Sequence, residues 1–182
     1  MRQKITPCLL PTPPPVERSG AFSCPSGDIG IEKMPLVLLF GPLYHLQNDA
    51  DKQQCIREAK RVCKDDGQIF FAFISNDFVF LTEFDRDVHY FGMGDYDHET
   101  FKLNDFPFVF HTVDAARKLL SDGGINILHE VAADGASELL AAKINEMSDE
   151  EYAQYLRYHF YICEKPELLG MTNHLLFVGA KN

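Results

Sequence analysis

The sequence predicts an α/β domain with a largely parallel sheet, and three segments near its start carry the prediction. Residues 36–40 (LVLLF) form an apolar run without alternation, which is typical of a strand covered on both faces. Apolar residues then recur at helical spacing: Cys55, Ile56, Ala59, Val62 and Cys63. Residues 69–74 (IFFAFI) form a second apolar run of strand length. A helix between two such strands indicates a right-handed βαβ crossover.

Local signals set the ends of that first helix. Asn48 or Asp49 can cap its N-terminus, because a short polar side chain can accept a hydrogen bond from the first turn. Asp65-Asp66-Gly67 is expected to end the helix, with Gly67 able to take a positive φ. Gly41-Pro42 is expected to stop the preceding strand.

The elements after residue 105 follow the same logic. Thr112 is expected to cap a helix that ends at Gly123-Gly124, before a strand over residues 125–131. Residues 136–147 predict another helix, and Ser148 with Glu151 forms the capping box of the next one. Its apolar stripe includes His159, which is read either as a hydrogen-bonded core histidine or as a ligand. Residues 174–179 predict the final strand.

The composition of the chain excludes several classes of function. The chain has 182 residues, 46% of them hydrophobic, which fits one globular domain. Its net charge is −10, and it has no basic run longer than Lys60-Arg61, so we expect no nucleic-acid partner. No apolar run approaches the ~20 residues that span a bilayer, and no signal-type segment opens the chain, so we expect no membrane partner.

The cysteines indicate a reducing compartment. There are five, an odd number, and they are widely spaced without a Cys-x-x-Cys pair: Cys8, Cys24, Cys55, Cys63 and Cys163. We therefore expect buried thiols and a cytoplasmic location. His89, Asp95, Asp97 and His98 match no standard metal-ligand spacing, so no metal site is predicted.

Residues 1–33 differ from the rest of the chain. Prolines crowd this segment, and Pro13-Pro14-Pro15 excludes a regular helix there. We expect a disordered or polyproline arm. It is either a proline-rich ligand for a partner domain, a solvated tail, or sequence from an altered gene start.

Three segments together resemble a known family. Residues 38–46 (LLFGPLYHL), residues 57–62 (REAKRV) and the glycine turn before the second apolar strand are similar to the fourth and fifth strands of Rossmann-like (class I) S-adenosylmethionine-dependent methyltransferases. The Gly-Pro-Leu-Tyr-His-Leu loop resembles a branch that acts on small molecules. The resemblance runs from about Leu36 to the C-terminus. It implies a methyltransferase-like domain over residues 34–182 with only the last four strands of the family sheet, the final strand being antiparallel.

The resemblance also implies a site. Phe40, Gly41, Pro42 and Leu43 would form the wall beside the cofactor S-adenosylmethionine, while Tyr44 and His45 would face a small-molecule acceptor. His45 could act as the base that removes the acceptor proton. The alternative is that Tyr44 and His45 only fix the loop through hydrogen bonds.

Two family features are absent from the sequence before Leu36, namely the glycine-rich turn and the acidic strand end that hold the cofactor. Gly92-Met93-Gly94 comes after the fifth strand and is read as a loop. We therefore expect a truncated enzyme with little or no activity. The alternative is a non-catalytic remnant or interaction module, because the strand at residues 36–40 would lie on an open sheet edge and could pair with a second copy or another chain.

The connection over residues 85–105, rich in aromatic and acidic side chains, allows two interpretations. It is dense in aromatic residues, and a loop of this length is usually functional or disordered. By resemblance it is a lid over the substrate. The alternative is a surface segment that packs on the domain.

Overall fold

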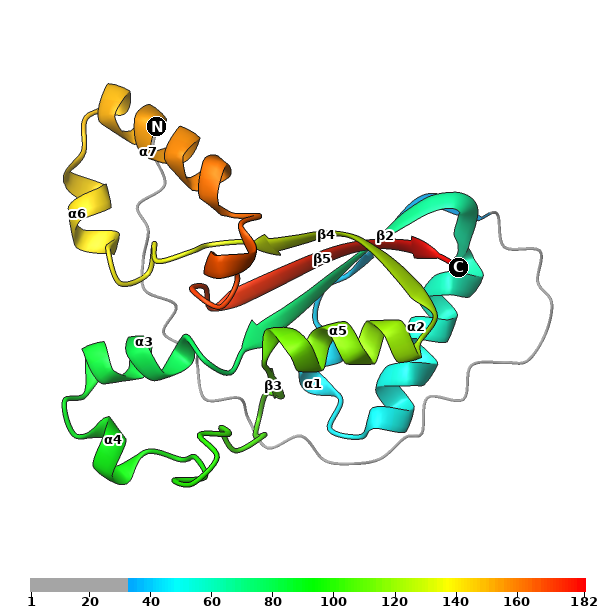
Figure 1. Cartoon of the computed structure of the whole chain (residues 1–182), viewed down its shortest axis with the longest axis horizontal. Helices are drawn as coiled ribbons and strands as arrows, with labels where there is room; N and C mark the ends of the chain where they lie inside the picture. The colour runs from blue at the N-terminus through cyan, green and yellow to red at the C-terminus, as the bar shows by residue number, and fades with distance from the viewer. Residues whose placement is uncertain (1–32) are drawn as a thin grey trace.

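The computed structural model describes residues 33–182, so the arm predicted over residues 1–33 lies, apart from Lys33, outside the described residues. The described part is a mixed sheet flanked by helices (Figure 1). In chain order its elements are β1 (Met34–Leu39), α1 (Pro42–His45), α2 (Asp49–Val62), β2 (Cys63–Ser75), α3 (Val79–Arg86), α4 (Tyr90–Met93), β3 (Phe110–His111), α5 (Val113–Asp122), β4 (Ile125–Ala132), α6 (Ala141–Glu146), α7 (Asp149–Ile162), the 3-10 turn η1 (Pro166–Leu168) and β5 (His174–Lys181).

The main strands lie in the order β1-β2-β5-β4. β1 is parallel to β2, whereas β5 is antiparallel to both β2 and β4. This arrangement confirms the prediction of four strands with an antiparallel final strand. The short strand β3 was not predicted. It pairs in parallel with the end of β2, beyond the point where β1 stops.

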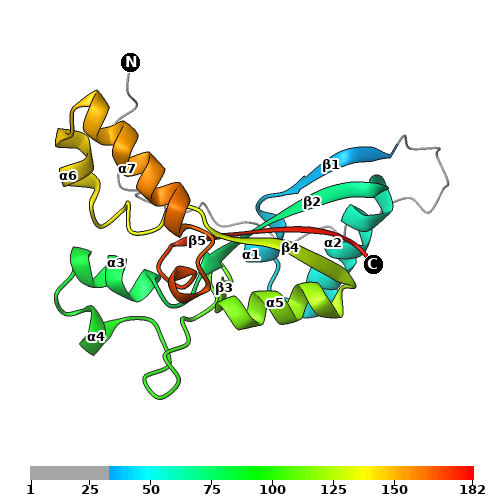
Figure 2. The ribbon, with the colours of Figure 1, turned by 45° about the horizontal axis from the view of Figure 1, so that its top comes forward.

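Helices α2 and α5 cover one face of the sheet and form the main core with it (Figure 2). Alternate side chains of β2 point into this layer, and all of them are fully buried: Ile69, Phe71 and Phe73. Ile56 of α2 and Leu120 of α5 pack against them. Each such side chain contributes on the order of 1.5–3 kcal/mol by leaving water.

The other face of the sheet is open at β1. Leu36 and Leu38 are 49% and 57% exposed, and no helix of residues 33–182 lies over them in Figure 2. The expectation that this strand is covered on both faces is therefore wrong for the described residues. The predicted edge position is confirmed within the same part of the chain, where β1 pairs with β2 alone.

Several predicted helix ends are confirmed by their caps. Ala50 N donates to Asn48 Oδ1 at 2.8 Å, Ala115 N donates to Thr112 Oγ1 at 3.1 Å, and the capping box of Ser148 and Glu151 is complete. The predicted helix over residues 136–147 is shorter, because α6 begins only at Ala141.

The predicted turn at Asp65-Asp66-Gly67 is wrong. α2 ends at Val62, and β2 starts at the next residue. Gly67 lies inside β2 without a positive φ. A Cβ at this position would lie 2.9 Å from Pro35 O, so the glycine permits close approach of β1 and not a turn.

The aromatic connection forms a small second core with α3 and α4. Phe80, Tyr96 and Leu103 are buried together, and the Tyr96 hydroxyl donates to Phe91 O at 2.6 Å. The side chain of Asn76, directly after β2, accepts a hydrogen bond from Leu103 N at 2.9 Å and donates one to Phe101 O at 2.9 Å. This packing favours the second alternative for residues 85–105, and the lid role stays a prediction.

Candidate functional site

The predicted loop lies where β1 ends, at the carboxyl edge of the sheet. Gly41 takes φ +121° and ψ −61°, a conformation that favours glycine, and turns the chain into α1. The Leu43 side chain is fully buried in the main core, so only its backbone remains to face a ligand. Val109 N donates to Tyr44 O at 2.9 Å and ties the loop to the segment before β3.

The loop brings Tyr44 and His45 together with an aromatic residue that sequence reasoning missed. The ring centroids of Tyr44 and His45 are 4.9 Å apart, and Phe108 lies 5.1 Å from His45 and 6.3 Å from Tyr44. Phe40 is half-exposed at the end of β1. The six predicted residues (40–45) thus form one continuous loop, and Phe108 extends the aromatic surface formed by Tyr44 and His45.

A polar network joins the end of β4 to the start of β5. The Asp134 carboxylate accepts the Thr172 hydroxyl, and it accepts the backbone N–H groups of Asn173 and His174, each at 3.1 Å. Its other oxygen contacts His174 Nδ1 at 2.7 Å. Thr172 Oγ1 in turn accepts Gly135 N at 3.1 Å. No spacing motif signals this network, because its partners are about 40 residues apart in the sequence.

The pKa shifts of this pair follow from its contacts. Burial acts to raise the pKa of Asp134, but the hydrogen bonds from His174 and Thr172 outweigh it and lower that pKa. The hydrogen bond to Asp134 raises the pKa of His174 against the opposing effect of burial. Both shifts favour an ionised pair at neutral pH.

A second set of polar contacts connects α3 to the segment after β4. Arg86 Nη2 donates to Glu138 Oε1 at 2.6 Å, while Nη1 of the same guanidinium pairs with Glu83. The other oxygen of Glu138 accepts Asn173 Nδ2. This ion pair therefore links the lobe formed by α3 and α4 to the chain that leads into α6 and α7.

Between these groups lies a hollow of about 110 Å³, hereafter the α3 hollow. Its lining combines apolar with polar side chains: Ile74, Val79, Phe108 and Phe110, together with Thr82, Glu83, Arg86, Glu138, Asn173 and His174. Phe108 belongs to this lining and also contacts Tyr44 and His45. The predicted loop and the α3 hollow are therefore neighbours at one edge of the sheet.

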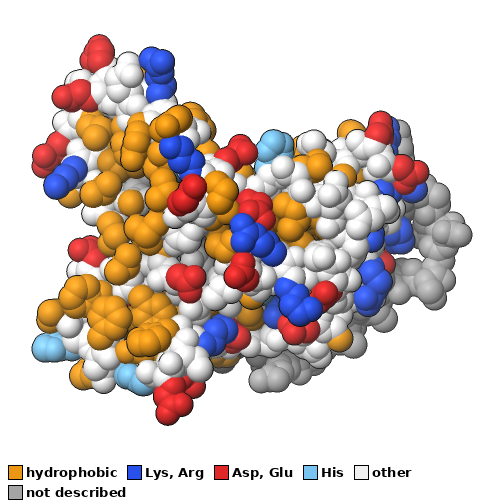
Figure 3. All heavy atoms as spheres, viewed as in Figure 1, with side chains coloured by type: hydrophobic (Ala, Val, Ile, Leu, Met, Phe, Trp, Pro, Cys, Tyr) orange, Lys and Arg blue, Asp and Glu red, His pale blue; other side chains and the backbone are white. Residues whose placement is uncertain are grey.

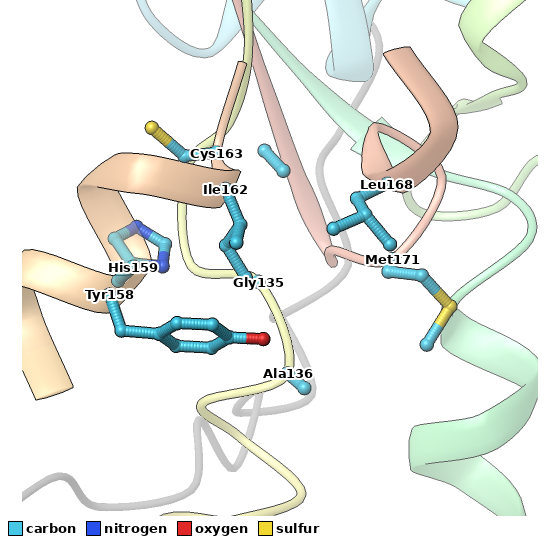
Figure 4. A pocket seen from close by; sticks show the side chains of 9 residues that line it. Gly135, Ala136, Tyr158, His159, Ile162, Cys163, Leu168 and Met171 are labelled. Atoms are coloured by element: carbon cyan, nitrogen blue, oxygen red, sulfur yellow. The ribbon is translucent and has the colours of Figure 1, made fainter. Parts of the chain in front are cut away.

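A second hollow of about 150 Å³ lies under α7 and is mostly apolar (Figure 4). Tyr158, His159 and Ile162 of α7 face Leu168 and Met171 across it. His159 is half-buried beside Gly135, so the structure places this histidine on the wall of a hollow. In the space-filling view, apolar side chains gather over both the α3–α4 and the α6–α7 lobes (Figure 3).

His111, at the end of β3, is a buried titratable group that sequence reasoning did not single out. It is 6% exposed, its ring lies 5.0 Å from that of Phe73, and its Nδ1 has no hydrogen-bond partner among residues 33–182. Burial, with the charges of Lys52 and Lys102 nearby, lowers the pKa of His111 to about 4. The imidazole is therefore neutral in the folded protein at pH 7.

Residues 33–182 contain no group of three or more His, Cys, Asp or Glu placed to hold a metal ion. Within the same range, every helix is too short or too polar to cross a lipid bilayer.

No family model and no curated protein matches the chain. Among solved structures, it is similar to the pyocyanin biosynthetic protein PhzM, at 11% identity and a TM-score of 0.44, over 83% of this chain and 31% of that one. It is similar to the CcbJ methyltransferase of Streptomyces caelestis at 10% identity and a TM-score of 0.46, over 85% of this chain and 64% of that one. It is also similar to an S-adenosylmethionine-dependent methyltransferase of Clostridium acetobutylicum, at 12% identity and a TM-score of 0.43, over 83% of this chain and 59% of that one. The chain thus spans 31–64% of the length of these structures.

The strand pairings themselves decide the fold class. The order β1-β2-β5-β4, the antiparallel β5 and the glycine turn after β1 are the features that the family resemblance implied. Residues 33–182 therefore form a mixed α/β sheet that has the edge position of β1 and the antiparallel final strand implied by that resemblance.

Proposed function

We propose that this chain is an S-adenosylmethionine-dependent methyltransferase-like protein that acts on a small-molecule acceptor and holds the methyl donor weakly on its own. The observation that carries this proposal is the position of the Gly-Pro-Leu-Tyr-His-Leu loop. It leaves β1 at the carboxyl edge of the sheet, where open α/β sheets bind their ligands, and it adjoins the α3 hollow.

The roles follow from placement along the loop. Gly41 and Pro42 form backbone wall beside the donor, together with Phe40 and the main chain of Leu43. Tyr44 and His45 face the acceptor, where His45 is the candidate base and Phe108 a neighbouring aromatic surface. Residues 33–182 contain no glycine-rich turn or acidic strand end beside β1 to complete a donor site, and this supports weak binding.

Nuclear magnetic resonance with S-adenosylmethionine added to millimolar concentration tests both parts. We expect shifts in the amide signals of residues 40–45, with α7 unaffected. A dissociation constant in the low micromolar range would contradict weak binding. Absence of any shift in the loop would contradict the methyltransferase assignment itself.

A second candidate function is an interaction module that pairs through β1. The open edge of this strand and its exposed leucines support it, since such an edge can add a strand from a second copy or another chain. Size-exclusion chromatography with light scattering distinguishes a monomer from a self-paired dimer. A strict monomer at all concentrations would remove the homodimer version of this candidate.

We place the protein in the cytoplasm as part of the same proposal. Cys55, Cys63 and Cys163 are free thiols, and burial raises the pKa of each, which keeps it unreactive. Imaging of a fluorescent fusion tests this location, and accumulation outside the cytoplasm would contradict it.

A further inference from the structure

We infer that the α3 hollow binds a small organic ammonium ion that carries a single apolar ring. The lining of the hollow combines apolar and charged side chains, and α3 contributes both kinds. Four observations carry the inference: the balance of charge, the buried amide and hydroxyl groups, the free acceptor capacity of the carboxylates, and the size of the space.

The charge balance of the hollow leaves an unmatched carboxylate. The Arg86 guanidinium is shared between Glu83 and Glu138, so one positive charge faces two negative ones. His174, the other basic group on the wall, is matched by Asp134 outside the hollow. Counted together with Asp134, these groups carry one net negative charge, and the whole chain has a net charge of −10. A cation is favoured and an anion is disfavoured.

Two polar groups of the lining are buried. Thr82 and Asn173 are 4% and 5% exposed, and the Thr82 hydroxyl lies 3.4 Å from Asn173 Oδ1. Asn173 Nδ2 holds Glu138 in place, and Ser75 N donates to Asn173 O at 2.8 Å, which fixes the asparagine backbone to the end of β2. These contacts orient the Glu138 carboxylate before a ligand arrives, which lowers the cost of binding.

The carboxylates retain acceptor capacity toward a ligand. Each oxygen of Glu138 accepts one hydrogen bond, from Arg86 or from Asn173. An ionised carboxylate has about four lone-pair sites, so about two remain for the N–H groups of an ammonium ion. Charge-assisted hydrogen bonds of this kind are about twice as strong as neutral ones.

The apolar side and the volume limit the rest of the ligand. The apolar part of the lining consists of Phe108 and Phe110 with Ile74 and Val79. The volume is about 110 Å³. An apolar cavity of about 150 Å³ accommodates benzene, so this smaller space limits the ligand to at most one ring or a short branched chain. Aromatic faces also attract cations, which adds to the preference for an amine.

The binding claim is independent of the methyl donor. In a methyltransferase the amine would be the acceptor, and that role rests on the proposed function. The hollow, in contrast, binds or rejects an amine whether or not S-adenosylmethionine is held by the loop at residues 40–45. If amine binding fails its test, the binding of S-adenosylmethionine at residues 40–45 is still tested by its own experiment, and the reverse also holds.

Three ligands of the same shape test the inference on the wild-type chain: benzylamine, benzyl alcohol and benzoate. We expect benzylamine to bind at least tenfold more tightly than either, with amide shifts at Thr82, Glu138 and Asn173 in nuclear magnetic resonance. Equal binding of the three, tighter binding of benzoate, or no shift at these amides with millimolar benzylamine would overturn it.

A matched pair of variants locates the site. Glu138→Gln removes the unmatched charge and is expected to weaken benzylamine binding about tenfold. Glu146→Gln, an exposed change near the end of α6, is expected to leave it unchanged. Circular dichroism verifies that both variants fold. Equal affinity of folded Glu138→Gln and wild type would overturn the inference, and the comparison of the three ligands stands even if the variant does not fold.

Discussion

Asp134 and His174 form an ion pair of 2.7 Å that fastens the end of β4 to the start of β5. The Asp134 carboxylate also accepts the backbone N–H groups of Asn173 and His174 and the hydroxyl of Thr172. One side chain thus satisfies most of the polar groups at this corner. The antiparallel insertion of β5, which defines the fold class, is anchored here.

Replacement of Asp134 by Asn is expected to lower the free energy of unfolding by about 2–4 kcal/mol, because it leaves several buried donors without their charged acceptor. Urea denaturation measures the change. Asp85→Asn, on the exposed side of α3, is the control and should stay within about 0.5 kcal/mol of wild type. Equal stability of the two variants would show that the network does not support the fold.

His111 predicts a specific acid sensitivity. Its folded pKa is about 4, below the value of about 6.5 expected in the unfolded chain. Between these values the unfolded chain binds the proton that the folded chain excludes, so this stability is complete above pH 6.5 and is lost as the pH falls toward 4. The loss approaches about 3 kcal/mol.

Urea denaturation of wild type and His111→Phe at a series of pH values isolates this contribution. The phenylalanine variant removes the titrating group and the unpartnered Nδ1. We expect the decline between pH 6.5 and 4 to be shallower in the variant. Parallel curves for the two proteins would disprove the assignment to His111.

Gly41→Ala is expected to destabilise the protein by about 1–3 kcal/mol, because φ of +121° strains any residue with a Cβ. The space around Gly41 is not the cause, since the nearest atom outside its neighbours would lie 3.9 Å from the added Cβ. Gly92→Ala is the matched control, with no positive φ and open space around the Cβ. Thermal unfolding of both variants compares them, and a similar small effect at both sites would refute the strain argument.

Leu38→Lys is expected to change stability by no more than about 0.5 kcal/mol, because this side chain is already more than half exposed. It should reduce self-association, since a charge on an open edge opposes pairing. Light scattering over a concentration series measures the association. Val88→Lys, an exposed site beside the α3–α4 lobe, serves as comparison, and equal effects of the two changes would exclude β1 as the pairing edge.

Short-range features were predictable from the sequence because their partners are close in the chain. The caps at Asn48, Thr112 and Ser148 each use a donor two or three residues away. The strand order was predictable through the family resemblance. The turn at Gly67 was misread because a glycine after a helix also suits a strand whose neighbour passes close by.

Long-range features escaped for the opposite reason. Arg86 and Glu138 are 52 residues apart, and nothing local marks them as partners. The exposed face of β1 could not be read from residues 36–40 either, because an unbroken apolar run is the same whether or not a second layer covers it. Phe108 lies at the site only because residues 107–111 pack beside the loop that follows β1.

The Asn76 side chain limits the movement of the segment over residues 101–110. Its amide holds Phe101 and Leu103, and Lys102 and Asp105 bond the backbone of Phe110 at the other end of the same segment. A stretch of chain tethered at both ends does not swing outward like a flap. These hydrogen bonds therefore oppose an outward movement of residues 101–110 beside the α3 hollow, whose lining includes Phe108 and Phe110.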